Sequence, residues 1–212
     1  MSDVLNNTSD LAGIPDRDPA RSRVYKTISW VLLAVGVLLT FYVAASYFHT
    51  YSAQRALAAQ WDRQNMAAPS VDLAADDAND AVTRLSIPKI KLDALVVEGT
   101  THKALLAGPG HLSDTPQPGT SGNSVLAAHR DTFFRNLNDL VAGDDIFIRR
   151  ARHEYHYVVT SKAIVPPTDT SVLRHSSHSR ITLITCYPPY FIGPAPKRLA
   201  VQADPAPVSA AR

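Results

Sequence analysis

The chain has 212 residues, with 21 Lys and Arg against 19 Asp and Glu, so its formal net charge is +2. This length accommodates one compact domain with accessory segments, or two small domains. A hydrophobic content of 45% excludes a wholly disordered chain. The near balance of charges argues against a nucleic-acid-binding protein, which needs a concentrated basic surface. With one cysteine, the chain can form no intramolecular disulfide.

Residues 28–48 predict a membrane-spanning helix. The run ISWVLLAVGVLLTFYVAASYF has 21 positions without a charged side chain. At about 1.5 Å per residue it matches the roughly 30 Å hydrocarbon core of a bilayer. Trp30 near one end, with Tyr42 and Tyr47 toward the other, suits the two membrane interfaces. Because a cleavable signal peptide has a shorter apolar run that starts closer to the first residue, we interpret this segment as a retained signal anchor.

The basic residues around this span predict its orientation. The residues that precede it are Arg17, Arg21, Arg23 and Lys26. Only Arg55 and Arg63 follow within a comparable distance. The positive-inside rule therefore predicts a cytoplasmic N-terminus, with everything from residue 49 onward outside the cytoplasm. An unpaired cysteine in that location is open to oxidation, so its presence calls for a function.

Composition divides the rest of the chain. Residues 51–65 predict a helical stalk, because Leu57 and Trp61 are spaced i, i+4 among alanines. Residues 66–83 are small, acidic and free of aromatics, which is typical of a solvated linker. The predicted organisation is a cytoplasmic tail (1–27), a transmembrane signal anchor (28–48), a helical stalk and acidic linker (49–83), a folded domain (84–204) and a flexible Pro/Ala-rich tail (205–212).

Short β-like runs separated by Gly, Pro, Asn and Asp dominate the domain. Strands are expected at 85–90, 94–98, 124–129, 145–149, 155–160, 181–186 and 198–202. Short helical turns are expected at 101–107 and 133–140. Many short strands within a domain of this size predict an all-β fold, either a closed barrel or a sandwich.

Cys186 is the first candidate for chemistry. It ends the strand-like run ITLITC and precedes YPPYFIGPAPK, a loop stiffened by four prolines. A thiol at a strand end beside a rigid loop is well placed at the lip of a cleft. The alternative is a buried cysteine that acts as a small hydrophobe. The predicted export favours the nucleophile, because an exported lone thiol is a liability unless it is used.

A cysteine nucleophile needs an acid–base partner, because a thiol with a pKa of about 8.5 is only a few per cent ionised at neutral pH. His129 ends the run SVLAAH and therefore repeats the placement of Cys186 at a strand end. The other histidines stand in contexts typical of surface or structural residues: His49, His102, His111, His153, His156, His175 and His178. His111 is expected in a loop, and His153 and His156 are expected to flank a hairpin.

Arg198 begins the run RLAVQA, 12 residues after Cys186. If the proline-rich loop folds back as a hairpin, Arg198 returns beside Cys186. Strand alternation then turns Leu199 toward the core and Arg198 to the other face. A cation there suits a developing oxyanion. The alternative for an isolated arginine is a surface ion pair.

These residues together resemble the sortase family. TLITC at 182–186 is similar to the TLxTC signature of sortases, and the order His129, Cys186, Arg198 matches their catalytic triad. The resemblance also covers LSIPKIKLDALVVEGT, GPGHL, GNSVLAAHRDTFF and TLITCYPPYFIGPAPKRLAVQA, of which the TCYP and GPAPKR segments look most like class D sortases. One departure is Ala128, where many sortases have Gly before the catalytic His.

The resemblance implies a membrane-anchored cysteine transpeptidase with an eight-stranded β-barrel. Such enzymes cleave an LPxTG-like sorting signal of secreted proteins after its Thr and pass the resulting thioester to an amine. The acceptor is a cell-envelope (peptidoglycan) precursor or a pilin subunit, and both acceptors remain open for this chain.

The resemblance also implies the roles of individual residues. Cys186 is the nucleophile, His129 protonates the leaving amine, and Arg198 holds the substrate carbonyl and its oxyanion. Thr185 is implied to help bind and position the substrate. No cofactor or metal is expected. The calcium dependence of some sortases is not carried over, because matching ligands are not found here.

Three other classes of protein remain as alternatives. An exported cysteine L,D-transpeptidase has an SHGC-like string, whereas Cys186 follows Thr185. A papain-like protease has its cysteine at the start of a helix, whereas ITLITC is strand-like. A non-catalytic membrane-tethered β-domain that scaffolds an envelope complex would use Cys186 only as core filler, and thiol labelling of the folded domain distinguishes that case.

Overall fold

The computed structural model describes residues 19–66, 82–150 and 153–207. The chain separates into two compact units, Met1–Tyr47 and Phe48–Arg212. Residues 1–18 of the predicted cytoplasmic tail, most of the predicted acidic linker (67–81) and residues 208–212 of the predicted C-terminal tail lie outside the described residues.

Helix α1 (Pro19–Met66) contains both the predicted span and the predicted stalk in one run of 48 residues. Its stretch Arg23–Arg63 is long and apolar enough to cross a membrane, with a mean hydropathy of 2.3 in its most apolar window. The hydroxyl of Thr40 donates to the Gly36 carbonyl at 2.8 Å. This bond satisfies the Thr40 hydroxyl, which would be costly to leave unpaired in hydrocarbon.

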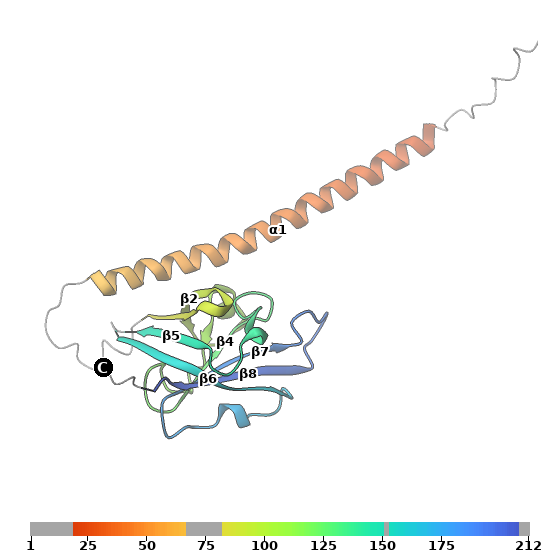
Figure 1. The fold of residues 1–212 in the computed structure, drawn as a ribbon. Coiled ribbons are helices and arrows are strands. Elements are labelled where there is room, and N and C mark those ends of the chain that lie inside the picture. The colour runs from red at the N-terminus through yellow and green to blue at the C-terminus, as the bar shows by residue number, and fades with distance from the viewer. Residues whose placement is uncertain (1–18, 67–81, 151–152, 208–212) are drawn as a thin grey trace, which may run out of the picture. The chain divides into compact units, whose positions relative to one another are not determined.

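Eight strands form a closed barrel in the second unit (Figure 1). They are β1 (Thr83–Ile87), β2 (Leu92–Glu98), β3 (Gly110–His111), β4 (Asn123–Ala127), β5 (Asp145–Arg150), β6 (His153–Val165), β7 (Arg180–Tyr187) and β8 (Lys197–Pro205). The order around the barrel is β1-β2-β3-β4-β7-β8-β6-β5. The predicted all-β barrel is confirmed. Closure gives each described strand a neighbour on both sides and so limits the sheet edge that is open to another chain.

Most strands differ from their predicted bounds by a few residues. The strand predicted at 124–129 is β4, which ends at Ala127, so His129 follows the strand instead of ending it. Two further strands differ for clear local reasons. The strand predicted at 85–90 stops at Ile87, because Pro88 opens a 3-10 turn, η1 (Pro88–Ile90), and Lys91 then adopts a φ of 53°. The strand predicted at 155–160 is the 13-residue β6, which pairs with β5 along its first half and with β8 along its second. Both histidines expected to flank a hairpin therefore lie within β6.

Strand β3 has only two residues, too few to show alternation in the sequence. His111, expected in a loop, lies in this strand and is buried. The helical segment predicted at 101–107 is α3 (His102–Ala107), whose N-cap Thr101 accepts a hydrogen bond from the amide of Ala104. The helical turn predicted at 133–140 is reduced to η2 (Leu137–Asp139), and a further turn, η3 (Ser171–Leu173), precedes β7.

The barrel interior is filled by aliphatic side chains that alternate along the strands. Strand β7 contributes Ile181 and Leu183, and β8 contributes Leu199, Val201 and Ala203, all essentially inaccessible to water. Burial of each large aliphatic side chain stabilises the fold by about 1.5–3 kcal/mol. Because alternate residues point inward, the residues between them project from the outer face of the barrel.

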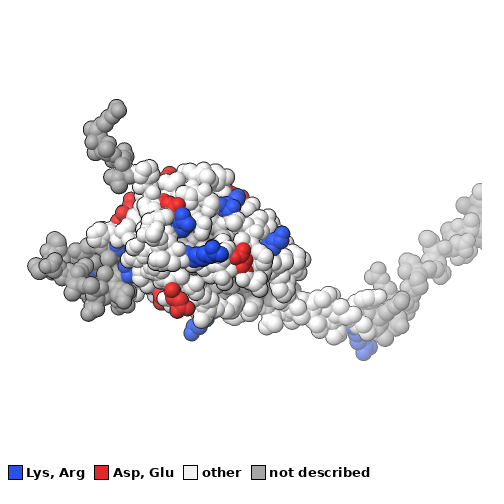
Figure 2. Space-filling view, turned by 90° about the horizontal axis from the view of Figure 1, so that it is seen from below, with Lys and Arg blue, Asp and Glu red and all other residues white. Residues whose placement is uncertain are grey.

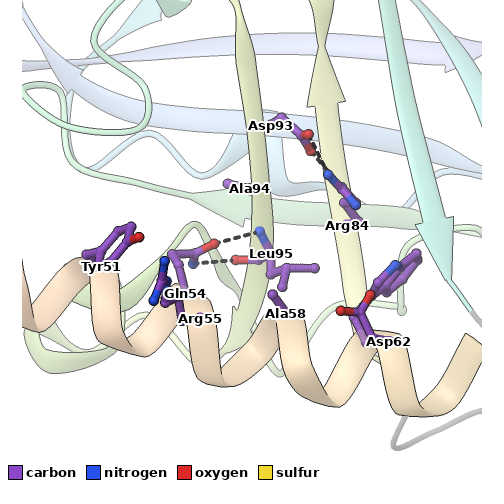
Figure 3. A pocket seen from close by; sticks show the side chains of 10 residues that line it. Tyr51, Gln54, Arg55, Ala58, Asp62, Arg84, Asp93, Ala94 and Leu95 are labelled. Carbon is purple, nitrogen blue, oxygen red and sulfur yellow. Dashed lines mark hydrogen bonds and ion pairs between the residues drawn. The ribbon is translucent and has the colours of Figure 1, made fainter.

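The end of α1 that belongs to the second unit contacts strand β2. Strand β3 pairs only with Val97 and Glu98, the last two residues of β2. On the side of β2 that faces β3, the backbone of Leu95 therefore has no strand partner. The side chain of Gln54 fills this position: its Oε1 accepts from the Leu95 amide at 3.0 Å, and its Nε2 donates to the Leu95 carbonyl at 3.1 Å (Figure 3). One glutamine amide thus replaces a missing rung of the β-ladder.

Opposite charges are interspersed on the face of the domain shown in Figure 2. Several are paired directly, including Arg84 with Asp93 at 2.6 Å and Arg180 with Asp204 at 2.7 Å. The Arg180–Asp204 pair joins the beginning of β7 to the end of β8, and the Arg180 guanidinium lowers the pKa of Asp204. The Arg180–Asp204 contact thus helps to hold together the two strands that carry Cys186 and Arg198.

Candidate active site

Strand β7 runs between β4, to which it is parallel, and β8, to which it is antiparallel. Cys186 near the end of β7 is directly paired with Arg198 of β8. The last pair of the β4–β7 ladder is Ala127 with Ile184, so His129 and Cys186 each lie two residues beyond it. Three residues from distant parts of the chain therefore lie at one end of the adjacent strands β4, β7 and β8. Figure 1 shows these strands in the barrel.

The three side chains also share the outer face of the barrel. Leu183 and Leu199 are part of the core, so alternation turns both Cys186 and Arg198 outward. Leu126 and Ala128 are likewise in the core, and the Ala128 amide continues the ladder by donating to the Ile184 carbonyl at 3.3 Å. His129 is thereby turned to the same face as the other two.

Thr185 points the opposite way from its neighbour Cys186. It is buried, and its hydroxyl donates to the carbonyl of Ala128 at 2.7 Å. That carbonyl belongs to the peptide bond that leads into His129, so the hydroxyl joins the two strand ends that carry the candidate nucleophile and acid. Ala128 itself is only 5% exposed, and its methyl group packs in the core.

His129 lies in a partly buried environment. Burial lowers the pKa of its imidazole, and His102 lowers it further, while the carboxylate of Asp131 raises it. Its Nε2 is buried and has no hydrogen-bond partner among the described residues. The ring of His102 makes an edge-to-face contact with the His129 ring, with 5.3 Å between centroids and 63° between planes.

Two arginines hold the loop between β7 and β8. The Nη1 of Arg198 donates to the carbonyls of Ala195 and Lys197, at 3.3 and 3.1 Å. Arg130, directly after His129, donates to three carbonyls of the same loop, those of Pro188 at 3.2 Å, Phe191 at 2.7 Å and Gly193 at 3.0 Å. Sequence reasoning missed Arg130, and its position beside His129 was the only available signal.

The remaining histidines of the barrel mostly have structural partners, as predicted. Buried His111 contacts the carboxylate of Glu98 at 3.0 Å. His156 and His178 contact Asp145 and Asp204 on the surface, at 2.7 and 3.0 Å. His102 differs, because it lies against His129. No three His, Cys, Asp or Glu side chains form a metal-ligand group among the residues that the structure describes.

Comparison with known proteins identifies the family. Residues 85–206 match the sequence model of the Sortase domain. The chain belongs to the sortase family. Sortase D of Bacillus subtilis (strain 168) is 40% identical to this sortase over 119 residues, which cover 55% of this chain and 60% of that protein. Sortase A of Bacillus anthracis is 32% identical over 114 residues, covering 52% of this chain and 54% of that protein.

The chain thus matches less than two thirds of the length of these two relatives. Among solved structures, a Sortase D5 transpeptidase of Clostridium perfringens superposes with a TM-score of 0.62 at 23% identity, over 74% of this chain and 99% of that one. This likeness supports the barrel fold. The predicted resemblance to class D sortases is confirmed by the sequence match to sortase D.

Proposed function

We propose that this sortase is a membrane-anchored cysteine transpeptidase that uses Cys186, His129 and Arg198. The observation that carries the proposal is the meeting of these three residues at one end of β4, β7 and β8, on one outer face of the barrel. Scaffolding requires neither this meeting nor a partly exposed thiol, and Cys186 is partly exposed.

The first half of the reaction forms a thioester. The Cys186 thiolate attacks the carbonyl carbon of the Thr in an LPxTG-like sorting signal, and a tetrahedral intermediate forms. As that intermediate collapses, the C–N bond breaks and His129 gives its proton to the leaving amine. In the second half, an acceptor amine attacks the thioester carbon, neutral His129 takes up the amine proton, and Cys186 departs as a thiolate.

The active form of this pair has Cys186 deprotonated and His129 protonated. Burial lowers the pKa of His129, so the imidazolium is a stronger acid toward the leaving amine but a smaller fraction of the enzyme at neutral pH. Raising the pKa of His129 should therefore increase the active fraction. A group that contacts the His129 ring can therefore affect the fraction of enzyme in the active form.

Arg198 is proposed to stabilise the oxyanion of the tetrahedral intermediate. The backbone of Arg198 is paired with that of Cys186, and both side chains project from the outer face of the barrel. The guanidinium stays ionised at any working pH, and it offers several N–H donors to one oxygen. A fixed cation is most valuable where charge develops only in the transition state.

Thr185 is proposed to position the two reacting strand ends rather than to touch the substrate. Its hydroxyl is committed to the Ala128 carbonyl and lies on the inner side of the strand. The residue expected from the resemblance to help position substrate would do so by holding Cys186 and His129 in register.

The anchor and the substrates complete the proposal. The apolar stretch of α1 would hold the enzyme in the membrane, with its N-terminus in the cytoplasm and its barrel outside. The acyl donor would be a secreted protein with a C-terminal LPxTG-like signal. The acceptor would be an amine of a cell-envelope precursor or of a pilin subunit.

The test is a substitution series assayed on LPxTG-type peptides, with hydroxylamine or oligoglycine as acceptor and mass spectrometry as readout. Cys186→Ala should abolish the thioester, because the chain has no other thiol. His129→Ala should leave a folded enzyme that acylates very slowly. Arg198→Lys keeps the charge but loses the planar fork, and it should reduce the rate by about 10²–10³. Wild-type turnover by Cys186→Ala, on a substrate that the parent processes, would refute the mechanism.

A further inference from the structure

His102 contacts the ring of His129 although it comes from a different element, α3. The two imidazoles meet edge to face, with 5.3 Å between their centroids. The contact joins an exposed side chain on the first residue of α3 to the partly buried His129 after β4. Such a contact restricts the rotation of the enclosed ring and places a second titratable group beside it.

Helix α3 is held firmly at both ends, so the contact does not depend on a loose segment. At its start, the hydroxyl of Thr101 accepts from the Ala104 amide at 3.2 Å. At its end, the carbonyls of Leu106 and Ala107 accept from the side chains of Thr50 and Gln54, at 2.9 and 2.7 Å.

Close packing also fixes the residue that follows α3. A Cβ on Gly108 would come within 2.6 Å of the Leu95 carbonyl. The same glutamine that completes β2 in Figure 3 therefore also secures the end of α3, and the backbone there fits against β2 without room for a side chain.

The groups around His129 define what its protonation responds to. His102 approaches from α3, Asp131 follows in the same segment, and Cys186 and Arg198 come from β7 and β8. Arg130 is engaged with loop carbonyls. Asp131 favours the imidazolium form of His129, whereas a positive charge on His102 opposes it.

We propose that His102 is a positioning residue for the reaction, whose ring orients the imidazole of His129 through their edge-to-face contact. The contact also couples the two rings electrostatically, because a positive charge on His102 disfavours a proton on His129. The effect on rate rests on the proposed function, whereas the coupling of the two rings does not.

The test measures ring titration and turnover separately, using the full chain in detergent micelles. Histidine rings labelled with ¹³C report the pKa of His129 by NMR in the parent, His102→Phe, His102→Ala and Lys103→Ala. His102→Phe keeps an aromatic ring against His129 but cannot be charged. Lys103→Ala removes a positive charge from the next residue of α3 and serves as the matched control.

The pKa of His129 should rise in both His102 variants, because one of the causes that lower it is gone. In His102→Phe, kcat/KM over the pH range in which His129 titrates should change by the same factor as the measured imidazolium fraction of His129. In His102→Ala, kcat should instead fall by up to about 10²-fold, because the ring contact that orients His129 is lost. Lys103→Ala should change neither quantity.

Unchanged titration of His129 in both His102 variants would overturn the proposal, as would an equal change in Lys103→Ala. Equal kcat values for His102→Phe and His102→Ala would overturn the positioning role. The NMR titration needs no turnover, so it decides the coupling of the two rings even if no peptide is processed. A failure of this inference is thereby distinguished from a failure of the proposed activity.

Discussion

Thr185 and Cys186 are adjacent in β7, yet their side chains serve opposite faces of the barrel. Cys186 projects outward with Arg198, while the Thr185 hydroxyl turns inward to the carbonyl of Ala128. The bond spans 57 positions of sequence and joins the strand that carries the nucleophile to the one that leads into His129. The buried Thr185 hydroxyl thereby helps to fix the relative positions of Cys186 and His129, although it does not lie on their face of the barrel.

Replacing Thr185 with Val should lower both stability and turnover. Val keeps the shape of Thr but leaves the Ala128 carbonyl without this donor, so the free energy of unfolding should fall by about 1–2 kcal/mol. We expect kcat to fall about tenfold, because His129 and Cys186 lose their common register. Thermal unfolding and peptide turnover measure the two effects, and Thr185→Ser should restore both.

Thr182→Val is the matched control for this prediction. Thr182 lies on the same strand, is fully buried, and donates its hydroxyl to the side chain of Asn123 at 2.7 Å. The substitution of Thr182 should lower the free energy of unfolding by a similar amount without lowering kcat. Thr182 lies three residues before Thr185 in β7, and its hydroxyl bonds to Asn123 at the start of β4 instead of to the peptide that leads into His129. Equal losses of kcat in the two valine variants would contradict a specific role for Thr185.

At the scale of elements, the loop between β7 and β8 is organised by Arg130. Prolines restrict the backbone of this loop, and one guanidinium draws together carbonyls from both of its arms. The loop starts beside Cys186 and ends at Arg198, so its shape affects both residues. Arg130 also follows His129 directly, which links the loop to the third member of the site.

Arg130→Leu should reduce kcat/KM about tenfold while the barrel stays folded. The loop carbonyls lose their donors, and the approach of a peptide to Cys186 becomes less well defined. Arg130→Lys should recover only part of the loss, because one ammonium group cannot reproduce the planar fork. Peptide kinetics and far-UV circular dichroism make the measurement.

Arg135→Leu provides the comparison for Arg130. It removes an exposed arginine from the same segment after β4. The kinetics of this variant should match those of the parent. If Arg130→Leu also retains parental kinetics, the loop does not depend on its arginine clamp.

At the scale of the whole molecule, the chain combines a long apolar helix with a closed barrel. The barrel is closed, so it offers little open strand edge for pairing with other strands. The apolar stretch of α1 would keep it at the membrane surface, where sorting signals of membrane-inserted substrates would emerge.

The barrel is predicted to lie outside the cytoplasm, because four Lys and Arg precede the span and two follow it. Protease added to intact cells, with any outer membrane permeabilised, should digest the domain from about residue 84 onward. A cytoplasmic marker protein should survive the same treatment. Full protection of the domain, with the protease shown to be active, would reverse the topology.

The sequence by itself determined the features that depend on local pattern. The uncharged run at 28–48 predicted a helix long enough to span a bilayer, and α1 contains it. Alternation located the strands that are long enough to show it. Strand-end placement likewise singled out Cys186 and His129, and the proline-rich loop brought Arg198 back beside Cys186, as the register confirms. The sequence did not predict strand β3, because two residues are too few to show alternation.

Only the tertiary structure decided which elements meet across long separations in the chain. The parallel pairing of β4 with β7 turns Thr185 against the Ala128 carbonyl and places His129 beside Cys186. The folded barrel likewise brings Arg130 to the loop carbonyls and His102 to the His129 ring. Alternation tells which side of a strand is buried but not which strand lies next to it, because that choice depends on the packing of the whole core.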